Sequence, residues 1–341
     1  MRATIIGGGI GGLALALALL RNGWEVEVRE RSADLPSGGT GLGMWPEAMA
    51  ALDSLGVGDA VRKQSVHCAG GALLRADGTI IAGLGAERSA HLVARNTLLR
   101  TLYAALPPEA VRWNSPYSPE QGFPGGDLLV GADGIHSSVR SAVLPGVGPR
   151  KLGTTAFRGV IAGRVGTVSE TWTRGGLFGI TPAGGNGINW FAALRSELVP
   201  AGDHLDSAGF LRRFFDGAHP AVRAVVDTLT PDRIDRRTLL DVQLTGSYVS
   251  GRTVLIGDAA HAMAPNLGRG ACETLLDAVA LADALAGSQD LDSGLRQFDR
   301  VRRPVGRRMV RLARVLNRAA TAKHLLPVRN GLVSAAARFG A

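Results

Sequence analysis

The sequence has few of the residues that form disulfides, bind zinc or stack on nucleic-acid bases. Its 341 residues include only two cysteines, Cys68 and Cys272, which lie far apart and form no CxxC pair. This spacing argues against both a disulfide framework and a zinc site. Aromatic residues make up only 5% of the chain, so stacking platforms for bases are scarce.

Long apolar runs are also missing. The run Leu13 to Leu20 follows Met1-Arg2 and looks like the core of a signal peptide. The glycines just before it and the strand-like segment just after it do not fit that interpretation. No stretch reaches the roughly 18 apolar residues that span a bilayer. We therefore expect a cytoplasmic protein with no membrane span.

Positive charge is in excess, but almost none of it comes from lysine. The formal net charge is +9, and the only lysines are Lys63, Lys151 and Lys323. A nucleic-acid partner is one interpretation of such a balance. Because the arginines are spread along the chain and aromatics are few, we favour a compositional bias and expect no nucleic-acid partner. An anionic substrate or cofactor would also suit a positive field.

The order of apolar runs predicts a βαβ unit at the start of the chain. Residues 2–6 are a β-type run, residues 13–21 are strong helix formers, and residues 24–30 alternate between apolar and polar. Further strands are expected at 128–132, at 253–257 and repeatedly over 66–94 and 151–200. Further helices are expected at 46–63, 95–106, 207–227, 271–286 and 292–320, whereas 107–126 is expected to be a loop.

The first motif with a chemical meaning is a glycine turn between the first strand and the first helix. Gly7, Gly9 and Gly12 fit GxGxxG, with Ile10 and Gly11 inside the motif. The first glycine permits a tight turn, the second a close approach of a pyrophosphate, and the third close packing of helix on strand. Glu30 ends the second strand, where an acid hydrogen-bonds the hydroxyls of an unphosphorylated ribose. A glycine turn without a ligand is the plainer alternative, which strand, helix and acid together disfavour.

Two later segments place further carboxylates at strand ends. Asp133 and Gly134 follow the strand at 128–132, and Asp258 follows the strand at 253–257. Ligands of parallel sheets bind at this carboxyl edge. After Asp258, the stretch from Pro265 through Gly268 and Gly270 to Ala271 predicts a tight backbone turn into a helix. Such a turn lets amides contact a flat ligand with little obstruction by side chains.

These three motifs, in this order, resemble the class A FAD-dependent aromatic monooxygenases, the para-hydroxybenzoate hydroxylase-like family. The resemblance covers most of the chain, and Ala156 to Gly159 looks like the opening of the family's substrate domain. It implies an α/β fold in which a Rossmann-like FAD-binding domain is interleaved with a β-rich substrate domain and followed by C-terminal helices. The shortness of the segment before Asp127 departs from the family, whose members usually have two more strands there.

The resemblance also assigns roles to single residues. Glu30 would hold the adenosine ribose, with Arg31 beside it, and Arg95 would contact the ribityl-pyrophosphate region. Asp258 would bind the ribityl chain or a phosphate, and Asp133, with Gly134 and Arg140, would support both FAD and the transient nicotinamide donor. The residues implied to bind FAD are Gly7, Gly9, Ile10, Gly11, Gly12, Glu30, Arg31, Arg95, Asp133, Asp258, Pro265, Gly268, Gly270 and Ala271. No catalytic residue and no metal ligand is predicted.

The implied domains are discontinuous. Residues 1–65, 95–150 and 250–290 would form the FAD-binding domain, and 66–94 with 151–249 the substrate domain. Residues 291–341 would form a C-terminal helical segment. His261, His136 and Cys272 are interpreted as structural, and Trp190 and Phe191 either stack on the substrate or pack in the core.

The implied activity is hydroxylation or epoxidation of a small aromatic or polyketide-like substrate. NADH or NADPH would act as a transient reductant, and a flavin C4a-hydroperoxide would deliver the oxygen. An FAD-dependent oxidase or reductase without oxygen insertion, and a non-catalytic FAD-binding protein, stay open as alternatives. Halogenation is disfavoured because the chain has no WxWxIP-type motif. The protein is expected to be a monomer or a homodimer.

Overall fold

A computed structural model describes residues 1–85, 89–202, 206–243 and 245–339. The chain divides into two compact units, each built from segments that are far apart in the sequence. The first unit comprises residues 1–64, 95–150 and 240–314. The second unit comprises residues 65–94, 151–239 and 315–341. Residues 291–341, expected to form a C-terminal helical segment, fall partly in the first unit and partly in the second.

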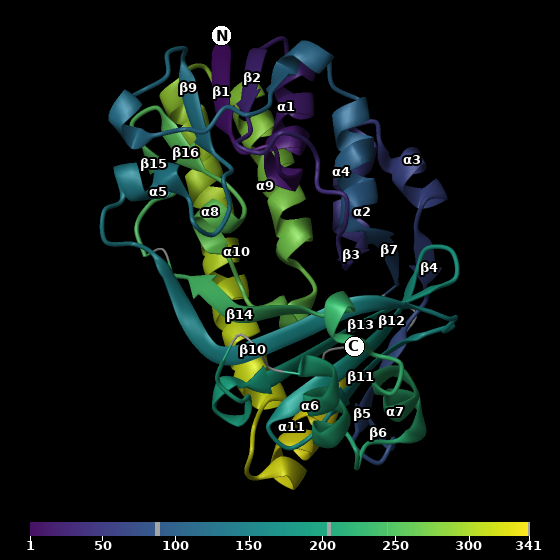
Figure 1. Ribbon diagram of the computed structural model, residues 1–341. Helices are drawn as coiled ribbons and strands as arrows, with labels where there is room; N and C mark the ends of the chain where they lie inside the picture. The colour runs from purple at the N-terminus through teal and green to yellow at the C-terminus, as the bar shows by residue number, and fades with distance from the viewer. Residues whose placement is uncertain (86–88, 203–205, 244, 340–341) are drawn as a thin grey trace. The chain divides into compact units, whose positions relative to one another are not determined.

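The first unit is built on a six-stranded sheet with the strand order β15-β16-β9-β1-β2-β8 (Figure 1). The pairings of β16 with β9, β9 with β1, β1 with β2 and β2 with β8 are parallel, whereas β15 pairs antiparallel with β16. The strands of this sheet are β1 (Arg2–Ile6), β2 (Glu25–Arg29), β8 (Val111–Arg112), β9 (Leu128–Gly131), β15 (Val249–Ser250) and β16 (Thr253–Leu255). The βαβ unit predicted at the start of the chain is present.

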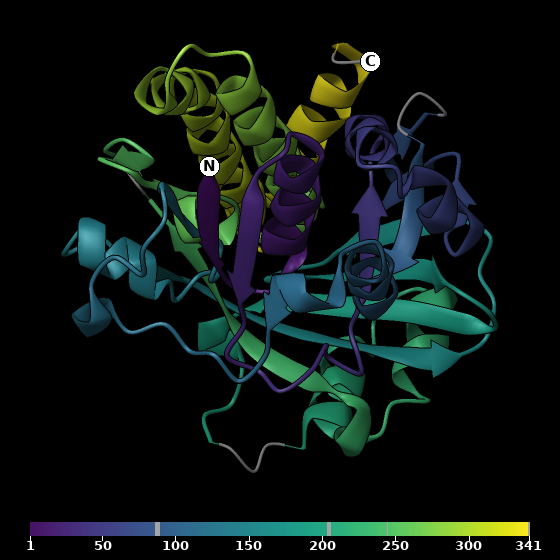
Figure 2. The ribbon, with the colours of Figure 1, turned by 90° about the horizontal axis from the view of Figure 1, so that it is seen from above.

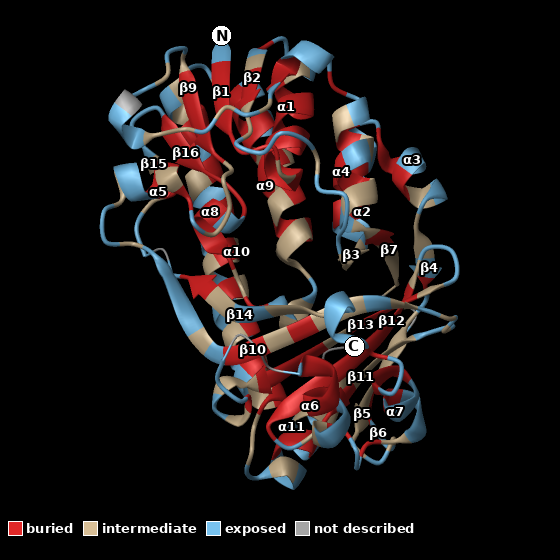
Figure 3. Ribbon diagram, viewed as in Figure 1, coloured by how far each residue is buried: buried red, intermediate tan, exposed pale blue. Residues whose placement is uncertain are grey.

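Helices pack beside this sheet, and α1 lies against α9 (Figure 2). Leucine and alanine fill α1, and its residues Ile10 to Leu19 are all buried (Figure 3). The first unit's helices are α1 (Ile10–Arg21), α2 (Pro46–Ser54), α3 (Gly58–Lys63), α4 (Arg95–Ala104), α5 (Ser138–Val143), α8 (Asp258–His261) and α9 (Gly270–Ala286). Its other elements are β3 (Gly41–Met44) and the 3₁₀ turns η2 (Pro108–Ala110), η3 (Pro119–Gln121) and η6 (Pro265–Leu267).

The second unit is built on a seven-stranded, mostly antiparallel sheet with the order β14-β10-β13-β12-β11-β5-β6. Its strands are β5 (Gly71–Arg75), β6 (Ile80–Leu84), β10 (Pro149–Ala162), β11 (Val168–Trp172), β12 (Gly176–Ala183), β13 (Gly187–Arg195) and β14 (Asp235–Val242). Outside this sheet, β4 (Val66–Cys68) and β7 (Ala90–Ala94) pair antiparallel. The remaining elements are α6 (Ser207–Phe214), α7 (Pro220–Val226), α11 (Leu326–Phe339), η4 (Ser196–Leu198) and η5 (Pro231–Arg233).

The long helix α10 (Leu291–Ala320) belongs to the first unit up to Arg314 and to the second unit from Val315 onwards. Pro304 lies inside it. Its arginines divide between exposed positions and buried ion pairs, as expected for an amphipathic helix that packs one face on the protein. Arg302, for example, is buried and pairs with Glu273 and Asp277 of α9.

Several sequence predictions were wrong in detail. The helix expected over 46–63 is interrupted at Gly56, whose φ of 69° lies in the left-handed region that favours glycine. The helix expected over 207–227 is likewise two helices, α6 and α7. The expected loop 107–126 contributes the short strand β8 to the first sheet. Helix α11 was not predicted.

The two faces of the second sheet bury different side chains. Phe178, Trp190 and Phe157 point to one face and pack against α6 and α7. Trp190 stacks on Phe178 with 5.8 Å between the ring centroids, so the packing interpretation holds for this tryptophan. Trp172 and Leu177 point to the other face. There they belong to one apolar cluster with Ala320, at the end of α10, and Val333 of α11 packs against this cluster.

Glu170 shares the second face with Trp172, because the two residues are two positions apart on one strand. The Trp172 Nε1 donates a hydrogen bond of 2.5 Å to Glu170 Oε1. Across the neighbouring strands, Glu170 lies opposite Gly179, and Gly179 lies opposite Phe191. Glu170 is half-buried, and the desolvation of its carboxyl raises the pKa from 4.5 to about 7. This carboxyl therefore titrates close to neutral pH.

Replacing Glu170 with glutamine should reduce the pH dependence of stability. A raised pKa in the folded state means that protonation favours folding. The stabilisation is complete below pH 4.5 and is lost as the pH rises through about 7. Between these limits, the free energy of unfolding of wild type relative to Glu170→Gln should fall by on the order of 2–3 kcal/mol.

Urea unfolding at about pH 5 and about pH 8 measures this difference, with Glu109→Gln as a matched control. Glu109 is exposed, and its replacement should leave the pH dependence of wild type unchanged. A constant offset between wild type and Glu170→Gln at the two pH values would contradict the raised pKa of Glu170.

Candidate functional site

Two positions around the turn between β1 and α1 can be occupied only by glycine. Gly7 has a φ of 110°, and a Cβ added there would overlap the carbonyl oxygen of Ala132. A Cβ added at Gly12 would overlap the carbonyl oxygen of Gly7. The glycine pattern thus lets α1 start directly against the strand ends, as its spacing predicts.

Gly9 is the opposite case, because a Cβ added there would meet no atom within 4 Å. It is the N-cap of α1, and no side chain caps this helix end. The first amides of an α-helix have no partner within the helix. Uncapped amides beside open space are the usual setting of a bound phosphate.

Glu30 follows β2 and is held by the backbone on both sides. Its Oε2 accepts a hydrogen bond of 2.7 Å from the Gly8 amide, and its Oε1 accepts one of 2.8 Å from the Ser32 amide. These bonds fix the carboxylate beside the glycine turn and leave each oxygen a further acceptor site. Arg31, the next residue, is exposed.

Asp133 follows β9 and uses only one of its carboxylate oxygens. Its Oδ2 accepts hydrogen bonds from the amides of Ser138, at 2.7 Å, and Val139, at 3.2 Å. Its Oδ1 is buried and has no hydrogen-bond partner among the residues that the structure describes. Such orphaned buried oxygens are rare in folded proteins, so this atom indicates a water or ligand at the site.

Asp258 follows β16 through Gly257, whose φ of 57° again lies in the left-handed region. The side chain of Asp258 is exposed at the start of α8. Beyond it, Pro265 begins η6 and Gly268 ends it in the left-handed conformation. Helix α9 then begins without a side-chain cap.

The turn from Pro265 to Ala271 has open space at Gly270 and is anchored at its edges by hydrogen bonds. A Cβ added at Gly270 would meet no atom within 4 Å. Trp45 Nε1 donates to the Gly268 carbonyl at 3.3 Å, and Cys272 Sγ lies 3.2 Å from the Gly43 carbonyl. Burial raises the pKa of the Cys272 thiol to about 11, which favours the interpretation of a structural residue over a redox thiol.

Arg95 lies at the start of α4, and its amide donates to the Thr40 carbonyl at 3.2 Å. Its side chain is exposed. An added Cβ at Gly39 would approach the Arg95 side chain, so the segment before β3 passes directly over this arginine. Arg95 therefore neighbours the segment that leads into β3, the strand that carries Gly43.

Arg140 does not present its charge to open space. It is buried, and its guanidinium donates to the carbonyls of Ala259, at 2.9 Å, and Ile135, at 2.7 Å. It thus ties α5 to α8, and any support that it gives to a ligand acts through the backbone it holds. His136, which the sequence motif includes, is exposed.

The parallel strands explain how these residues come together. The turns that carry Gly7, Glu30, Asp133 and Asp258 follow β1, β2, β9 and β16, which are consecutive neighbours in one sheet. Their carboxyl ends lie at one edge because all four run in the same direction. Glu30 and Asp258 therefore lie at the same edge of the first unit, at the two sides of the glycine turn.

Sequence reasoning missed two groups. Gly8 is not among the predicted site residues, although its amide donates a hydrogen bond to Glu30. The only signal for this contact in the sequence was the position of Glu30 directly after the second strand. Glu170 belongs to no motif. The pKa of its carboxyl is raised by desolvation beside Trp172 in the folded sheet, and this packing could not be read from the sequence.

Comparison with known proteins places the chain in a family. The profile of the FAD binding domain family matches residues 1–112 and 126–313, and the unmatched stretch falls in the segment expected to be short. The chain is 34% identical over 328 residues to the aurachin C monooxygenase/isomerase of Stigmatella aurantiaca, covering 89% of this chain and 85% of that protein. It is 29% identical to the 3-hydroxybenzoate 6-hydroxylase of Klebsiella oxytoca, covering 93% and 88%.

A solved structure supports the fold. The HpxO protein of Klebsiella pneumoniae, complexed with FAD and uric acid, superimposes with a TM-score of 0.86 over 99% of this chain and 94% of that one, at 23% identity. No helix in the described part of the chain is long and apolar enough to cross a membrane. The predicted α/β class and family are confirmed, and the chain belongs to the FAD binding domain family, among the class A FAD-dependent aromatic monooxygenases.

Proposed function

We propose that FAD lies along the carboxyl edge of the first sheet, with its pyrophosphate at the start of α1. The observation that carries this proposal is the open space at Gly9 beside uncapped amides, flanked by the fixed carboxylate of Glu30. The first unit would then be the FAD-binding domain and the second unit the substrate domain. Arg31 and Arg95 would supply positive charge near the phosphates.

The remaining residues fit the other parts of the cofactor. Glu30 would accept hydrogen bonds from the adenosine ribose, and Asp133 Oδ1 would gain the partner that it lacks. Asp258, exposed at the start of α8, would face the ribityl chain. The turn of Pro265, Gly268, Gly270 and Ala271 would lie against the isoalloxazine ring, with the positive end of α9 directed at it.

Bound FAD, reduced by NADH or NADPH, supplies activated oxygen from O2 for insertion into the substrate. The protein's own residues bind and orient the cofactor, and none of them is proposed as a general base in the oxygen transfer. We propose that the product is a hydroxylated or epoxidised aromatic compound. An oxidase or reductase without oxygen insertion is the alternative, and neither of the named relatives favours it.

The substrate is proposed to be a small aromatic ring that carries an O–H or N–H donor. The 3-hydroxybenzoate of one relative and the uric acid bound to the structural neighbour both have such donors. In the second unit, Glu170 lies on the same sheet face as Phe191, whose ring occupies the space left by Gly179. The ring of Phe191 could stack on an aromatic substrate, while the carboxyl of Glu170 accepts a hydrogen bond from the substrate's O–H or N–H group. This arrangement supports Glu170 as the hydrogen-bond acceptor for the substrate.

Replacing Glu30 with glutamine should weaken FAD binding by roughly 10- to 100-fold. The variant loses one of two charge-assisted acceptor sites, each worth about 1.5–3 kcal/mol. Titration of the apoprotein with FAD, followed by flavin fluorescence, measures the change. Glu25→Gln is the matched control, because Glu25 is an exposed acid at the other end of the same strand. Equal FAD affinity in the two variants would show that Glu30 does not bind FAD.

Oxygen insertion is tested with a panel of phenols, aromatic acids and nitrogen heterocycles. The holoprotein should oxidise NADH or NADPH faster with a true substrate than without one. Under isotopically labelled O2, the product should gain one labelled oxygen atom. Stimulated NAD(P)H oxidation that leaves every compound unlabelled would favour the oxidase or reductase. Absence of stimulation in FAD-loaded protein across such a panel would favour a non-catalytic role.

A further inference from the structure

Three buried charged residues contact the turns proposed to bind FAD, or contact each other, and take no part in that proposal. Glu273 and Asp277 are on α9 and Arg302 is on α10, with exposed fractions of 1%, 0% and 7%. Charged side chains are almost never buried to this degree unless they are paired. The partners of these three residues therefore indicate what they do.

Asp277 holds the segment that presents Asp258 at both of its ends. Its Oδ2 accepts a hydrogen bond of 2.9 Å from the amide of Gly257, the residue before Asp258. The same oxygen lies 2.5 Å from Nε2 of His261, the last residue of α8. Asp258 is the first residue of α8 and is exposed. One buried carboxylate thus fixes the position of the single helical turn that carries Asp258.

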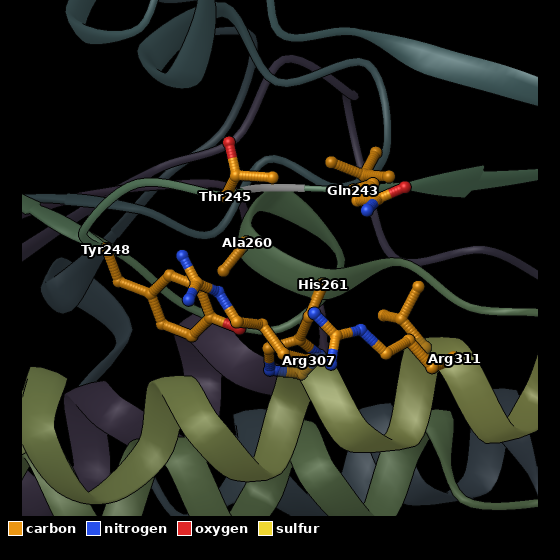
Figure 4. Close-up of a pocket in the computed structure, with 9 residues that line it drawn as sticks. Gln243, Thr245, Tyr248, Ala260, His261, Arg307 and Arg311 are labelled. Carbon is orange, nitrogen blue, oxygen red and sulfur yellow. The ribbon is translucent and has the colours of Figure 1, made fainter.

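The α10 helix also contacts this segment. His261 lies against α10, beside Tyr248, in the wall of a cavity (Figure 4). A Cβ added at Gly306 of α10 would lie 2.9 Å from Cδ2 of His261 and 2.5 Å from the hydroxyl oxygen of Tyr248, so glycine permits this close approach. Gly306 and Arg302 are four positions apart and therefore share one face of the helix.

Arg302 joins the two buried carboxylates of α9. Its Nε donates a hydrogen bond of 2.7 Å to Asp277 Oδ1, and its Nη2 donates one of 2.8 Å to Glu273 Oε2. The same Nη2 donates to the carbonyl of Glu273 at 3.2 Å. Because the guanidinium is planar and its donors form a rigid fork, these bonds fix both carboxylates relative to each other.

Glu273 extends the connection to the turn proposed to lie against the isoalloxazine ring. Its Oε1 accepts a hydrogen bond of 3.0 Å from Arg269 Nε. Arg269 lies between Gly268 and Gly270, inside the turn from Pro265 to Ala271. A continuous set of hydrogen bonds therefore runs from the Gly257 amide through Asp277, Arg302 and Glu273 to this turn.

Stability alone does not account for this network. Replacing buried ion pairs with apolar side chains of similar volume is often neutral or stabilising, because burying the charges carries a large desolvation cost. A fully paired network does specify one arrangement of the elements that it joins. All four carboxylate oxygens of Asp277 and Glu273 have partners, so the network meets that condition.

We propose that Arg302 is a positioning residue for the cofactor, which fixes the spacing between the Asp258 segment and the turn from Pro265 to Ala271. It acts through Asp277 and Glu273. The spacing matters because one ligand would contact both parts, with its ribityl chain at Asp258 and its ring at the turn. Contacts that are held in place before binding lower the ordering cost. This inference rests on the FAD site proposed above.

A double-mutant cycle of Arg302→Lys and Asp258→Asn tests this role, with FAD titrated into the apoprotein and followed by flavin fluorescence. Arg302→Lys keeps the charge but loses the planar fork, so it should weaken FAD binding by about fivefold or more. Asp258→Asn should weaken binding on its own. Spacing between two contacts matters only while both exist, so Arg302→Lys should cost about twofold or less in the Asp258→Asn background.

Arg303→Lys is the matched control. Arg303 is the next residue of α10 and pairs within its own helix, with Asp299 at 3.3 Å. The same substitution there should change FAD affinity by less than about twofold. The visible circular dichroism of bound flavin should change in Arg302→Lys and stay unchanged in Arg303→Lys, a difference that a purely stabilising role of Arg302 would not produce.

Urea unfolding establishes that each variant is folded before titration. If Arg302→Lys does not fold, Glu273→Gln takes its place in the cycle, because it keeps the shape of the side chain and leaves Asp277 bound to Gly257. The same weakening and the same dependence on Asp258 are expected from it.

Unchanged FAD affinity in Arg302→Lys, losses that multiply in the double variant, or the same flavin spectrum in Arg302→Lys and Arg303→Lys would overturn the positioning role and leave the FAD site intact. Unchanged affinity in Asp258→Asn would contradict the FAD site itself, and the positioning role with it.

Discussion

Parallel pairing of β16, β9, β1 and β2 is the constraint on which the candidate site depends. It brings the ends of strands from three distant stretches of the chain to a single sheet edge. The glycines then decide how closely the following turns approach one another. Gly7 touches the Ala132 backbone and Gly12 touches Gly7, so the amides of α1, the carboxylate of Glu30 and the orphaned oxygen of Asp133 share one edge.

The charged residues around this edge fall into a buried group and an exposed group. Arg140, Asp277 and Arg302 are buried, and each forms hydrogen bonds with backbone carbonyls, backbone amides or oppositely charged side chains. Asp258 and Arg95, by contrast, are exposed.

Local patterns predicted the part of the fold that local sequence controls. The strand, glycine turn, helix and strand over residues 2–30 were predictable because each carries its own periodicity and its own required glycines. Strand β8 was not, since two residues form a strand only where β2 offers an edge. Helix α11 was not, because Leu326–Phe339 has no clear apolar stripe and lies against β6 only in the folded unit. The position of Glu30 after a strand was predictable, whereas the raised pKa of Glu170 arises from the packing of its strand in the second sheet.

The most direct test of the central claim is a crystal structure of the protein with FAD bound. The account predicts the pyrophosphate against the amides that follow Gly9, the adenosine ribose at Glu30, and the isoalloxazine ring against the turn from Pro265 to Ala271. Cofactor density elsewhere on the chain, or a ribose that leaves the carboxylate of Glu30 bound only to Gly8 and Ser32, would contradict it.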